Sequence, residues 1–407
     1  MTYFRGFSTA VAAVVLVVLG GCCGRGHGVV DVPTDEAGIC SSGVTIHGYK
    51  CQEIQVQTKD GYILSVQRIP EGRYESDNGV KKQPVIIQHG VLVDGMTWLL
   101  NSPEQNLPLI LADKGYDVWI ANTRGTRFSR HHISLDPSSS AFWNWSWDEL
   151  VIYDLPAVFD HVSQETGHKI HYVGHSLGTL ILIASLAEGK LVEQLQSVAF
   201  LSPIAYLSHM TTVIGAVAAR SLLPQVVTKA LGVEEFDPKG VAVGNFLKSL
   251  CFRPRVNCYD LLSAFTGQNC CLNSSTVELF LKNEPQSTST RNMVHLSQIA
   301  RYGVLAKFNY ERMDYNLRHY GKINPPLYDL SKIPRDVPIF ISYGGRDALS
   351  DLRDVGHLLE ILKSHDVDKL TVQYIENYAH ADFIMGINAN DVVYKYLITF
   401  INKHGSV

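Results

Sequence analysis

The sequence is poor in charge and holds no cluster of basic residues. Of its 407 residues, 18% are charged, and 35 Lys and Arg stand against 39 Asp and Glu, which gives a formal net charge of −4. A protein that binds the backbone of a nucleic acid needs a positively charged surface that attracts phosphate groups. We therefore expect no nucleic acid partner.

The sequence also lacks an apolar run that could span a bilayer, which takes about 20 residues. The run from Ala10 to Leu19 is shorter, follows Arg5 and precedes the small residues Gly20 to Gly24. A basic, then apolar, then small region is typical of a secretory signal peptide, and a membrane anchor is the competing interpretation. We predict a signal peptide at residues 1–24, a mature protein without a transmembrane segment, and a destination that is extracellular or a vacuole-like or lysosome-like compartment.

Metal-binding cysteine patterns are missing as well, because the sequence has no pair of CxxC units and no Cys and His cluster at zinc-ligand spacing. Removal of the signal peptide leaves six cysteines: Cys40, Cys51, Cys251, Cys258, Cys270 and Cys271. In an oxidising compartment these are disulfide candidates, and buried unpaired cysteines are the alternative. We expect a Cys40–Cys51 bridge and at least one bridge within residues 251–271. Sequons at Asn144 and Asn273 predict N-glycosylation.

Hydrophobic residues make up 46% of the chain, enough for one large core, and no internal repeat occurs. Alternating apolar and polar residues over 53–69, around Asp60 and Gly61, predict a β-hairpin. Short apolar runs separated by helix-length segments follow, as in a parallel sheet buried on both faces. The predicted strands are Val85–Gln88, Tyr116–Ala121, Ile170–Val173, Val198–Leu201, Val337–Ser342 and Leu370–Ile375. The predicted helices are Trp147–Gln164, Leu177–Glu188, Asp354–Lys363 and Asp391–Lys403.

The interval from Pro203 to Pro334 breaks this alternation and is too long for a single loop. Two apolar stretches within it, Thr211–Leu223 and Val241–Leu250, have helical character. We therefore predict the α/β class, with a mostly parallel central sheet, flanking helices and an inserted, mostly helical cap or lid. The predicted parts are the first part of the core with its N-terminal hairpin at 25–202, the cap at 203–335 and the second part of the core at 336–407.

The strongest chemical signal is the run Gly174-His175-Ser176-Leu177-Gly178, which lies between a predicted strand and a predicted helix. In that context GxSxG is a nucleophile elbow, which presents the serine hydroxyl above the sheet. Such a sharp turn strains the serine backbone and brings strand and helix so close that side chains at the two glycine positions would collide. Ser176 is therefore the candidate nucleophile.

A serine hydroxyl needs a base, and the base needs an orienting acid. With this elbow the chain order is serine, acid, histidine. Asp347 follows the predicted strand Val337–Ser342, and His380 follows the last predicted strand, so we assign them as acid and base. Weaker candidates are Asp351, Asp354, His357 and His365. We interpret the two weaker aspartates as helix caps.

The oxyanion that forms during acyl transfer needs N–H donors. We assign them to the main chain of Leu177, directly after the nucleophile, and of Val91, in the loop after the strand Val85–Gln88. His89 lies in the same loop. Its side chain either braces the loop or takes a functional part, and the sequence leaves both interpretations open.

Several segments resemble the acid-lipase family of α/β-hydrolases, which includes gastric and lysosomal acid lipases and plant triacylglycerol lipase-like proteins. The matching segments are IIQHGVL, LADKGYDVWIANTRG, FWNWSWDELVIYDLPAVFDHV, HYVGHSLGT, SYGGRDALSD and NYAHADF. The resemblance implies an α/β-hydrolase fold with a lid, the triad Ser176, Asp347 and His380, and oxyanion donors on Val91 and Leu177. One departure is Leu177 itself, where gastric and lysosomal members carry glutamine. Because the donor there is main chain, this departure concerns substrate preference and not activity.

We therefore expect a serine ester hydrolase that cleaves carboxylic esters of lipids, such as triacylglycerols, at a lipid–water interface through an acyl-enzyme. The expected mechanism uses no metal and no organic cofactor. The alternatives are a steryl-ester, wax-ester or short-chain carboxylesterase, and a lipid-binding protein on a hydrolase scaffold without turnover.

Overall fold

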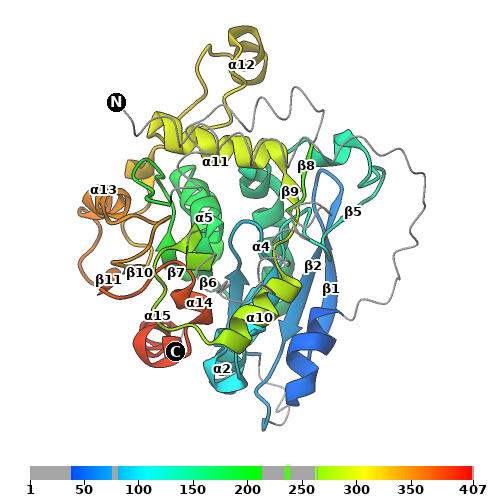
Figure 1. Ribbon diagram of the computed structural model, residues 1–407, viewed down its shortest axis with the longest axis vertical. Helices are drawn as coiled ribbons and strands as arrows, with labels where there is room; N and C mark the ends of the chain where they lie inside the picture. The colour runs from blue at the N-terminus through cyan, green and yellow to red at the C-terminus, as the bar shows by residue number, and fades with distance from the viewer. Residues whose placement is uncertain (1–37, 76–80, 213–233, 239–261, 264, 406–407) are drawn as a thin grey trace, which may run out of the picture.

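The computed structural model describes residues 38–75, 81–212, 234–238, 262–263 and 265–405 (Figure 1). The predicted signal peptide, Cys251, Cys258 and the predicted helix Val241–Leu250 lie outside the described residues, as does Thr211–Leu223 apart from its first two residues. The strands are β1 (Gln52–Gln57), β2 (Tyr62–Ile69), β3 (Pro84–Gln88), β4 (Asp117–Ala121), β5 (His131–His132), β6 (Ile170–Ser176), β7 (Leu195–Pro203), β8 (Glu235–Phe236), β9 (Thr288–Ser289), β10 (Ile339–Gly344) and β11 (Leu370–Ile375). The α-helices are α2 (Leu107–Asp113), α3 (Trp147–Glu149), α4 (Leu155–Thr166), α5 (Leu177–Ala187), α10 (Ser274–Asn283), α11 (Thr290–Tyr302), α12 (Met313–Tyr320), α13 (Leu352–Leu362), α14 (Asp382–Met385) and α15 (Lys395–His404). The shorter helical turns include η3 (Gly95–Leu99), η6 (Leu150–Asp154) and η9 (Asn390–Tyr394).

One mixed sheet forms the centre of the molecule. Its strand order is β1-β2-β4-β3-β6-β7-β10-β11, and β5 pairs with β2. The first pairs are antiparallel, and every pair from β4 to β11 is parallel. The predicted hairpin is β1 and β2, with Gln52 opposite Arg68, and Gly61 takes a φ of 98° in its turn, a value that glycine adopts without steric cost. The predicted class, a mostly parallel sheet with flanking helices, is confirmed.

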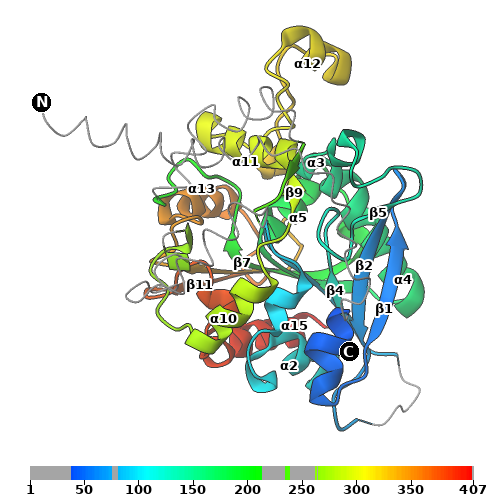
Figure 2. The ribbon, with the colours of Figure 1, turned by 45° about the vertical axis from the view of Figure 1, so that its right-hand side comes forward.

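Helices cover both faces of the sheet. Figure 2 shows α5 and α13 on one side of it and α2 and α15 on the other. Two buried hydrophobic clusters correspond to these faces, one that includes α4, α5 and α13 and one that includes α2 and α15. β3, β4 and β6 are buried along their whole length, which explains the short apolar runs in their sequences, whereas β11 is an edge strand and is partly exposed.

Between β7 and β10 the described chain leaves the sheet. It forms α10, α11 and α12, together with the short antiparallel pair β8 and β9. α11 lies above the core and α12 stands off the body of the molecule (Figures 1 and 2). The described helices agree with the helical character expected of a cap, and the boundaries 203–335 stay a prediction.

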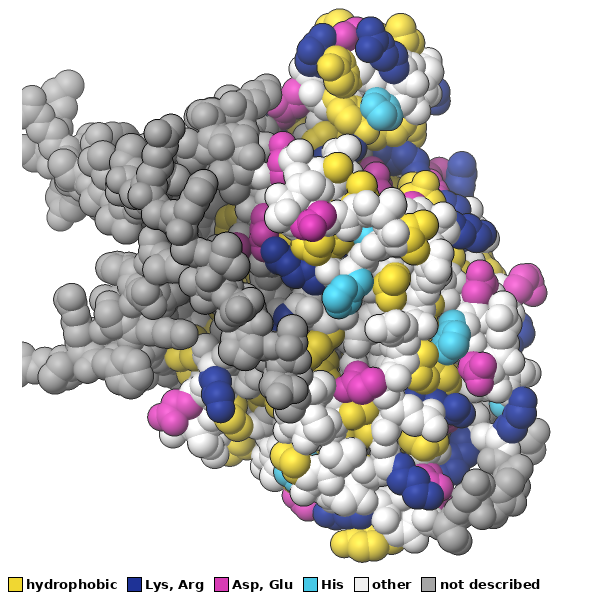
Figure 3. Space-filling model, turned by 90° about the vertical axis from the view of Figure 1, so that its right-hand side faces the viewer, with side chains coloured by type: hydrophobic (Ala, Val, Ile, Leu, Met, Phe, Trp, Pro, Cys, Tyr) yellow, Lys and Arg dark blue, Asp and Glu magenta, His cyan; other side chains and the backbone are white. Residues whose placement is uncertain are grey.

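Two disulfides are present among the described residues. Cys40 pairs with Cys51, as expected, with a Cα–Cα distance of 5.4 Å. Cys270 pairs with its neighbour Cys271, which confirms a bridge within residues 251–271. In the described part of the chain, no helix combines the length and apolarity that crossing a membrane requires. Basic and acidic side chains are interspersed on the face drawn in Figure 3.

Candidate active site

The turn at Ser176 has the geometry expected of a nucleophile elbow. Ser176 ends β6 and precedes α5, and its backbone has φ 54° and ψ −118°, a conformation that is costly for a residue with a side chain. A Cβ on Gly174 would lie 2.8 Å from the carbonyl oxygen of Gly178, and one on Gly178 would lie 2.7 Å from that of Gln88. Close backbone approach therefore requires both glycines, as the sequence predicts.

Asp347 and His380 lie on the loops that follow β10 and β11. These strands are parallel neighbours, so their loops leave the sheet at the same edge. His380 Nδ1 lies 2.9 Å from Oδ2 and 3.1 Å from Oδ1 of Asp347. Both side chains are buried, with exposed fractions of 6% for His380 and 0% for Asp347. The sequence-predicted acid and base are thus in direct contact.

The Asp347 carboxylate is fixed by two further donors. Its Oδ1 accepts hydrogen bonds from the backbone N–H groups of Leu349, at 2.9 Å, and Ser350, at 2.8 Å. Burial by itself raises the pKa of Asp347, but the attraction and hydrogen bond of His380, together with these backbone donors, outweigh burial and hold that pKa below its ordinary value. Asp347 is therefore a carboxylate that can orient an imidazole and stabilise its protonated form.

The weaker candidates from the sequence have structural partners. Asp351 caps α13 by accepting from Arg353 N–H, as interpreted. The capping interpretation is wrong for Asp354, because it lies in the first turn of α13 and accepts from the backbone N–H of His209 at 2.9 Å. His365 Nε2 lies 2.7 Å from the carbonyl oxygen of Val337, and the ring of His357 stacks on Tyr206.

His175, the residue directly before Ser176, joins the nucleophile turn to the loop after β11 that carries His380. Its Nε2–H donates to the carbonyl oxygen of His380 at 2.9 Å, and the two ring centroids are 4.6 Å apart. Burial, together with the nearby His380, lowers the pKa of His175 to about 3, so this imidazole is neutral and can donate from Nε2. This role of His175 was not predicted from the sequence. Its position inside the GxSxG motif is the one signal that could have found it.

The loop after β3 passes directly beside Ser176. A Cβ on Gly90 would lie 3.4 Å from Ser176 Oγ, so the backbone that leads into Val91 borders the nucleophile. His89 braces this loop, because its Nδ1–H donates to the carbonyl oxygen of Gly90 at 2.7 Å and its Nε2 accepts from Thr123 N–H at 3.1 Å. These contacts support the bracing interpretation of His89. Burial lowers its pKa, which is consistent with a neutral ring that both donates and accepts.

Leu177 is the first residue of α5, and the N–H groups in the first turn of a helix have no partner within the helix. An N–H there is available to an oxyanion above the turn. The roles of Val91 and Leu177 as donors stay a prediction.

The loop that carries His380 is held by residues 266–271, a short segment between β7 and β10 that was not predicted to be part of the site. The carbonyl oxygen of Thr266 accepts from His380 N–H at 3.1 Å. The Asp382 carboxylate accepts from the N–H groups of Ala379, at 2.8 Å, and of Cys270 and Cys271, at 3.1 Å each. The sulfur atoms of Cys270 and Cys271 come close to Asp382, but they form a disulfide and are not thiolates, so this set does not suit a metal ion.

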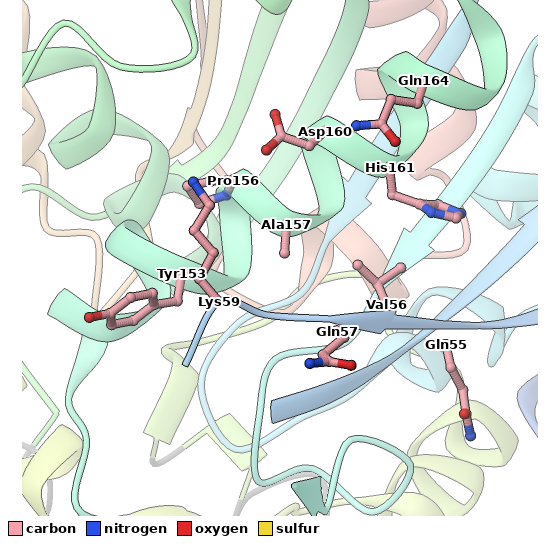
Figure 4. A pocket seen from close by; sticks show the side chains of 10 residues that line it. All are labelled: Gln55, Val56, Gln57, Lys59, Tyr153, Pro156, Ala157, Asp160, His161 and Gln164. Carbon is pink, nitrogen blue, oxygen red and sulfur yellow. The ribbon is translucent and has the colours of Figure 1, made fainter. Parts of the chain in front are cut away.

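A separate hollow lies between β1 and α4 (Figure 4). Its lining includes Gln57, Lys59, Asp160 and His161. The strands β2, β4 and β3 separate β1 from β6, which carries the elbow. This hollow is therefore not part of the site around Ser176.

Comparisons with known proteins show the family to which this chain belongs. The family described as "alpha/beta hydrolase fold" matches residues 83–386, and the "partial alpha/beta-hydrolase lipase region" matches residues 40–102. Triacylglycerol lipase 2 of Arabidopsis thaliana is 58% identical over 385 residues, which cover 94% of this chain and 92% of the relative. Human gastric triacylglycerol lipase is 34% identical over 368 residues, or 88% and 90% of the two chains. A monoglyceride lipase structure from Saccharomyces cerevisiae shares the fold, with a TM-score of 0.55 at 14% identity, over 88% of this chain and 96% of that one.

The fold and the elbow define an α/β-hydrolase. Because relatives above 30% identity cover most of the chain, this protein belongs to the lipase family that contains the plant and gastric triacylglycerol lipases, and it is a carboxylic ester hydrolase. The resemblance drawn from the sequence motifs is confirmed.

Proposed function

We propose that this lipase hydrolyses carboxylic esters of lipids such as triacylglycerols, with Ser176 as nucleophile, His380 as base and Asp347 as the orienting acid. The observation that carries the proposal is the buried His380–Asp347 contact on loops that leave the sheet beside the strained Ser176 turn. The names of the similar plant and gastric lipases support triacylglycerol as the substrate.

The reaction has two halves of the same kind. His380 Nε2 accepts the Ser176 hydroxyl proton as Oγ bonds to the ester carbonyl carbon, and the carbonyl oxygen becomes an oxyanion held by the N–H groups of Val91 and Leu177. Collapse of this intermediate breaks the carbon–oxygen bond to the alcohol, which leaves with the proton from His380. Water then attacks the acyl-enzyme with His380 again as base, and release of the fatty acid regenerates Ser176. No step requires a metal or an organic cofactor.

We also propose that the enzyme works at a lipid–water interface. Several large apolar side chains on or near the protruding α12 are strongly exposed, including Met313 (72%), Leu317 (53%) and Ile323 (55%). Exposed apolar groups gain free energy when they contact lipid instead of water. Figure 3 draws this protrusion at the top of the molecule, with hydrophobic and basic side chains beside each other.

We propose that the chain enters the secretory pathway and is secreted or delivered to a vacuole-like or lysosome-like compartment. Two disulfides support an oxidising environment. The sequon residues Asn144 and Asn273 are both exposed, which leaves them accessible to glycosylation.

The test compares wild type with Ser176→Ala and a matched control, Ser185→Ala. Ser185 is buried on α5, and its hydroxyl has no hydrogen-bond partner among the described residues. We expect S176A to lose hydrolysis of tributyrin and labelling by a fluorophosphonate, while S185A keeps both. Retained turnover by folded S176A contradicts the nucleophile assignment, and a folded wild type that never reacts with the fluorophosphonate favours a lipid-binding protein without turnover.

A further inference from the structure

A buried polar contact joins the segment that directly follows α10, which we call the cap side, to the loop that carries Val91. The backbone N–H of Gln286 donates to the carbonyl oxygen of Leu92 at 2.7 Å. The backbone N–H of Asp94 donates to Oε1 of Glu284 at 3.1 Å. The stretch between Val91 and η3 is therefore held at two points by residues that directly follow α10.

Among the described residues, this contact brings together the carboxyl groups of Asp94 and Glu284 and one guanidinium, that of Arg127. Asp94 and Glu284 are both fully buried, with exposed fractions of 0%. Arg127 Nε donates to Asp94 Oδ2 at 2.8 Å, and Asp94 Oδ1 accepts from Met96 N–H at 2.8 Å. Asp94 is thus compensated as a carboxylate, whereas the guanidinium of Arg127 is directed to Asp94 and not to Glu284.

The protonation state of Glu284 follows from this arrangement. Burial, and then the negative charge of Asp94, raise the pKa of Glu284 well above its ordinary value. The Asp94 N–H, the Gln286 side chain and the charge of Arg127 act in the opposite direction and are outweighed. Of the charged groups around Glu284, Asp94 belongs to the loop before η3 and Arg127 to the loop after β4. Glu284 is therefore uncharged over a pH range in which an ordinary glutamate is ionised.

We propose that Glu284 is a positioning residue for the oxyanion loop: in its uncharged form it fastens the cap side to Asp94, and loss of its proton at higher pH loosens this attachment. The ionised form puts a second negative charge beside Asp94 in a buried site with one guanidinium, which is unfavourable. Val91 lies three residues before Asp94 on the same loop, so a loosened attachment misplaces the proposed oxyanion donor. This inference rests on the proposed function, because it assigns Val91 to the oxyanion hole.

The direction of the pH effect is set by linkage. An acid whose pKa is raised in the folded protein stabilises its surroundings at low pH, and that contribution is lost as the pH rises through the raised pKa. The attachment is therefore intact on the acidic side and weakens on the alkaline side. Because oxyanion stabilisation acts in the transition state, the loss belongs to kcat and not to KM.

The experiment measures kcat and KM against pH for a water-soluble short-chain ester, p-nitrophenyl butyrate, so that lipid binding does not limit the rate. Wild type is compared with Glu284→Gln, which keeps the acceptor oxygen but cannot ionise. The matched control is Glu278→Gln, which makes the same change at an exposed position on α10. Thermal unfolding of each variant at each pH reports whether it is folded.

We expect the wild-type kcat to fall on the alkaline side by about tenfold per pH unit above the pKa of Glu284. E284Q stays within about threefold of wild type on the acidic side and lacks the alkaline fall, while E278Q follows wild type throughout. A wild-type kcat without a fall up to about pH 9.5, before lysine and tyrosine titrate, overturns the proposal. An alkaline fall that folded E284Q shares overturns it equally.

Fluorophosphonate labelling of the wild-type protein separates this inference from the proposed function. If Ser176 is not labelled in folded protein, the proposed function fails. If Ser176 is labelled but the two pH profiles coincide, the serine hydrolase remains and only the role of Glu284 is wrong.

Discussion

Replacing Asp347 by asparagine changes the oxygen atom that faces His380 into an NH2 group, and so tests whether Asp347 orients the proposed base. In the native structure, Oδ1 accepts from the backbone N–H groups of Leu349 and Ser350, and Oδ2 faces His380 Nδ1 at 2.9 Å. The asparagine carbonyl must keep the Oδ1 position, because an NH2 group there would face two donors. Its NH2 group is then forced toward Nδ1, which has to become an acceptor.

The consequence is the wrong tautomer of His380. With its proton on Nε2, the imidazole cannot accept the proton of Ser176. In serine hydrolases with this relay, such a change lowers kcat by about 10⁴-fold, which corresponds to about 5 kcal/mol of transition-state stabilisation. We expect this loss in kcat for p-nitrophenyl butyrate hydrolysis by Asp347→Asn, with little change in KM because Asp347 does not contact the substrate.

The matched control is Asp351→Asn, four residues further along the chain. Asp351 caps α13, and asparagine is an equally good cap, so D351N is expected to keep the wild-type rate and unfolding temperature. Thermal unfolding shows whether D347N is folded. A kcat loss below about tenfold in folded D347N, or an equal loss in D351N, refutes the reasoning.

Two further predictions concern stability. Gly178→Ala puts a methyl group 2.7 Å from the carbonyl oxygen of Gln88 and should lower the free energy of unfolding, measured in urea, by about 1–3 kcal/mol. Gly356→Ala, on a helix with open space around it, should raise this free energy by about 0.5–1 kcal/mol. Equal effects of the two changes would contradict the packing argument. Asp154→Ala removes one of the two carboxylates that pair with the buried Arg124, and because Asp60 keeps its own ion pair with this guanidinium, the change should destabilise by about 1–3 kcal/mol. An unchanged free energy of unfolding in the same assay would contradict this prediction.

The sequence was sufficient for those parts of the site that depend on neighbouring residues. The elbow around Ser176 combines a buried strand, two glycines and a helix within one short segment, and each has its own sequence signal. Asp347 and His380 could be chosen because parallel strands end at one edge of a sheet, so a residue directly after a strand has a predictable place. Their mutual contact follows from that topology.

Other residues of the site carry no local signal. Asp354 has the position of a helix-start residue, and only the fold turns its carboxylate toward His209. Asp382 follows the candidate histidine closely, yet its role as acceptor for Cys270 and Cys271 depends on where the cap segment returns to the core. Glu284 resembles any acidic residue at the end of a helix until its burial is known.

The sequence by itself determined the long strands of the central sheet, the hairpin, the elbow and the order of the candidate catalytic residues, but not the two-residue strands β5, β8 and β9. Periodicity and turn chemistry arise from interactions over a few residues, so they can be recognised in the chain before it folds. Only the tertiary structure decided which distant groups share a buried site. Asp94 and Glu284 are 190 residues apart in the chain, and their contact and their shared burial exist only because the cap side packs against the loop after β3.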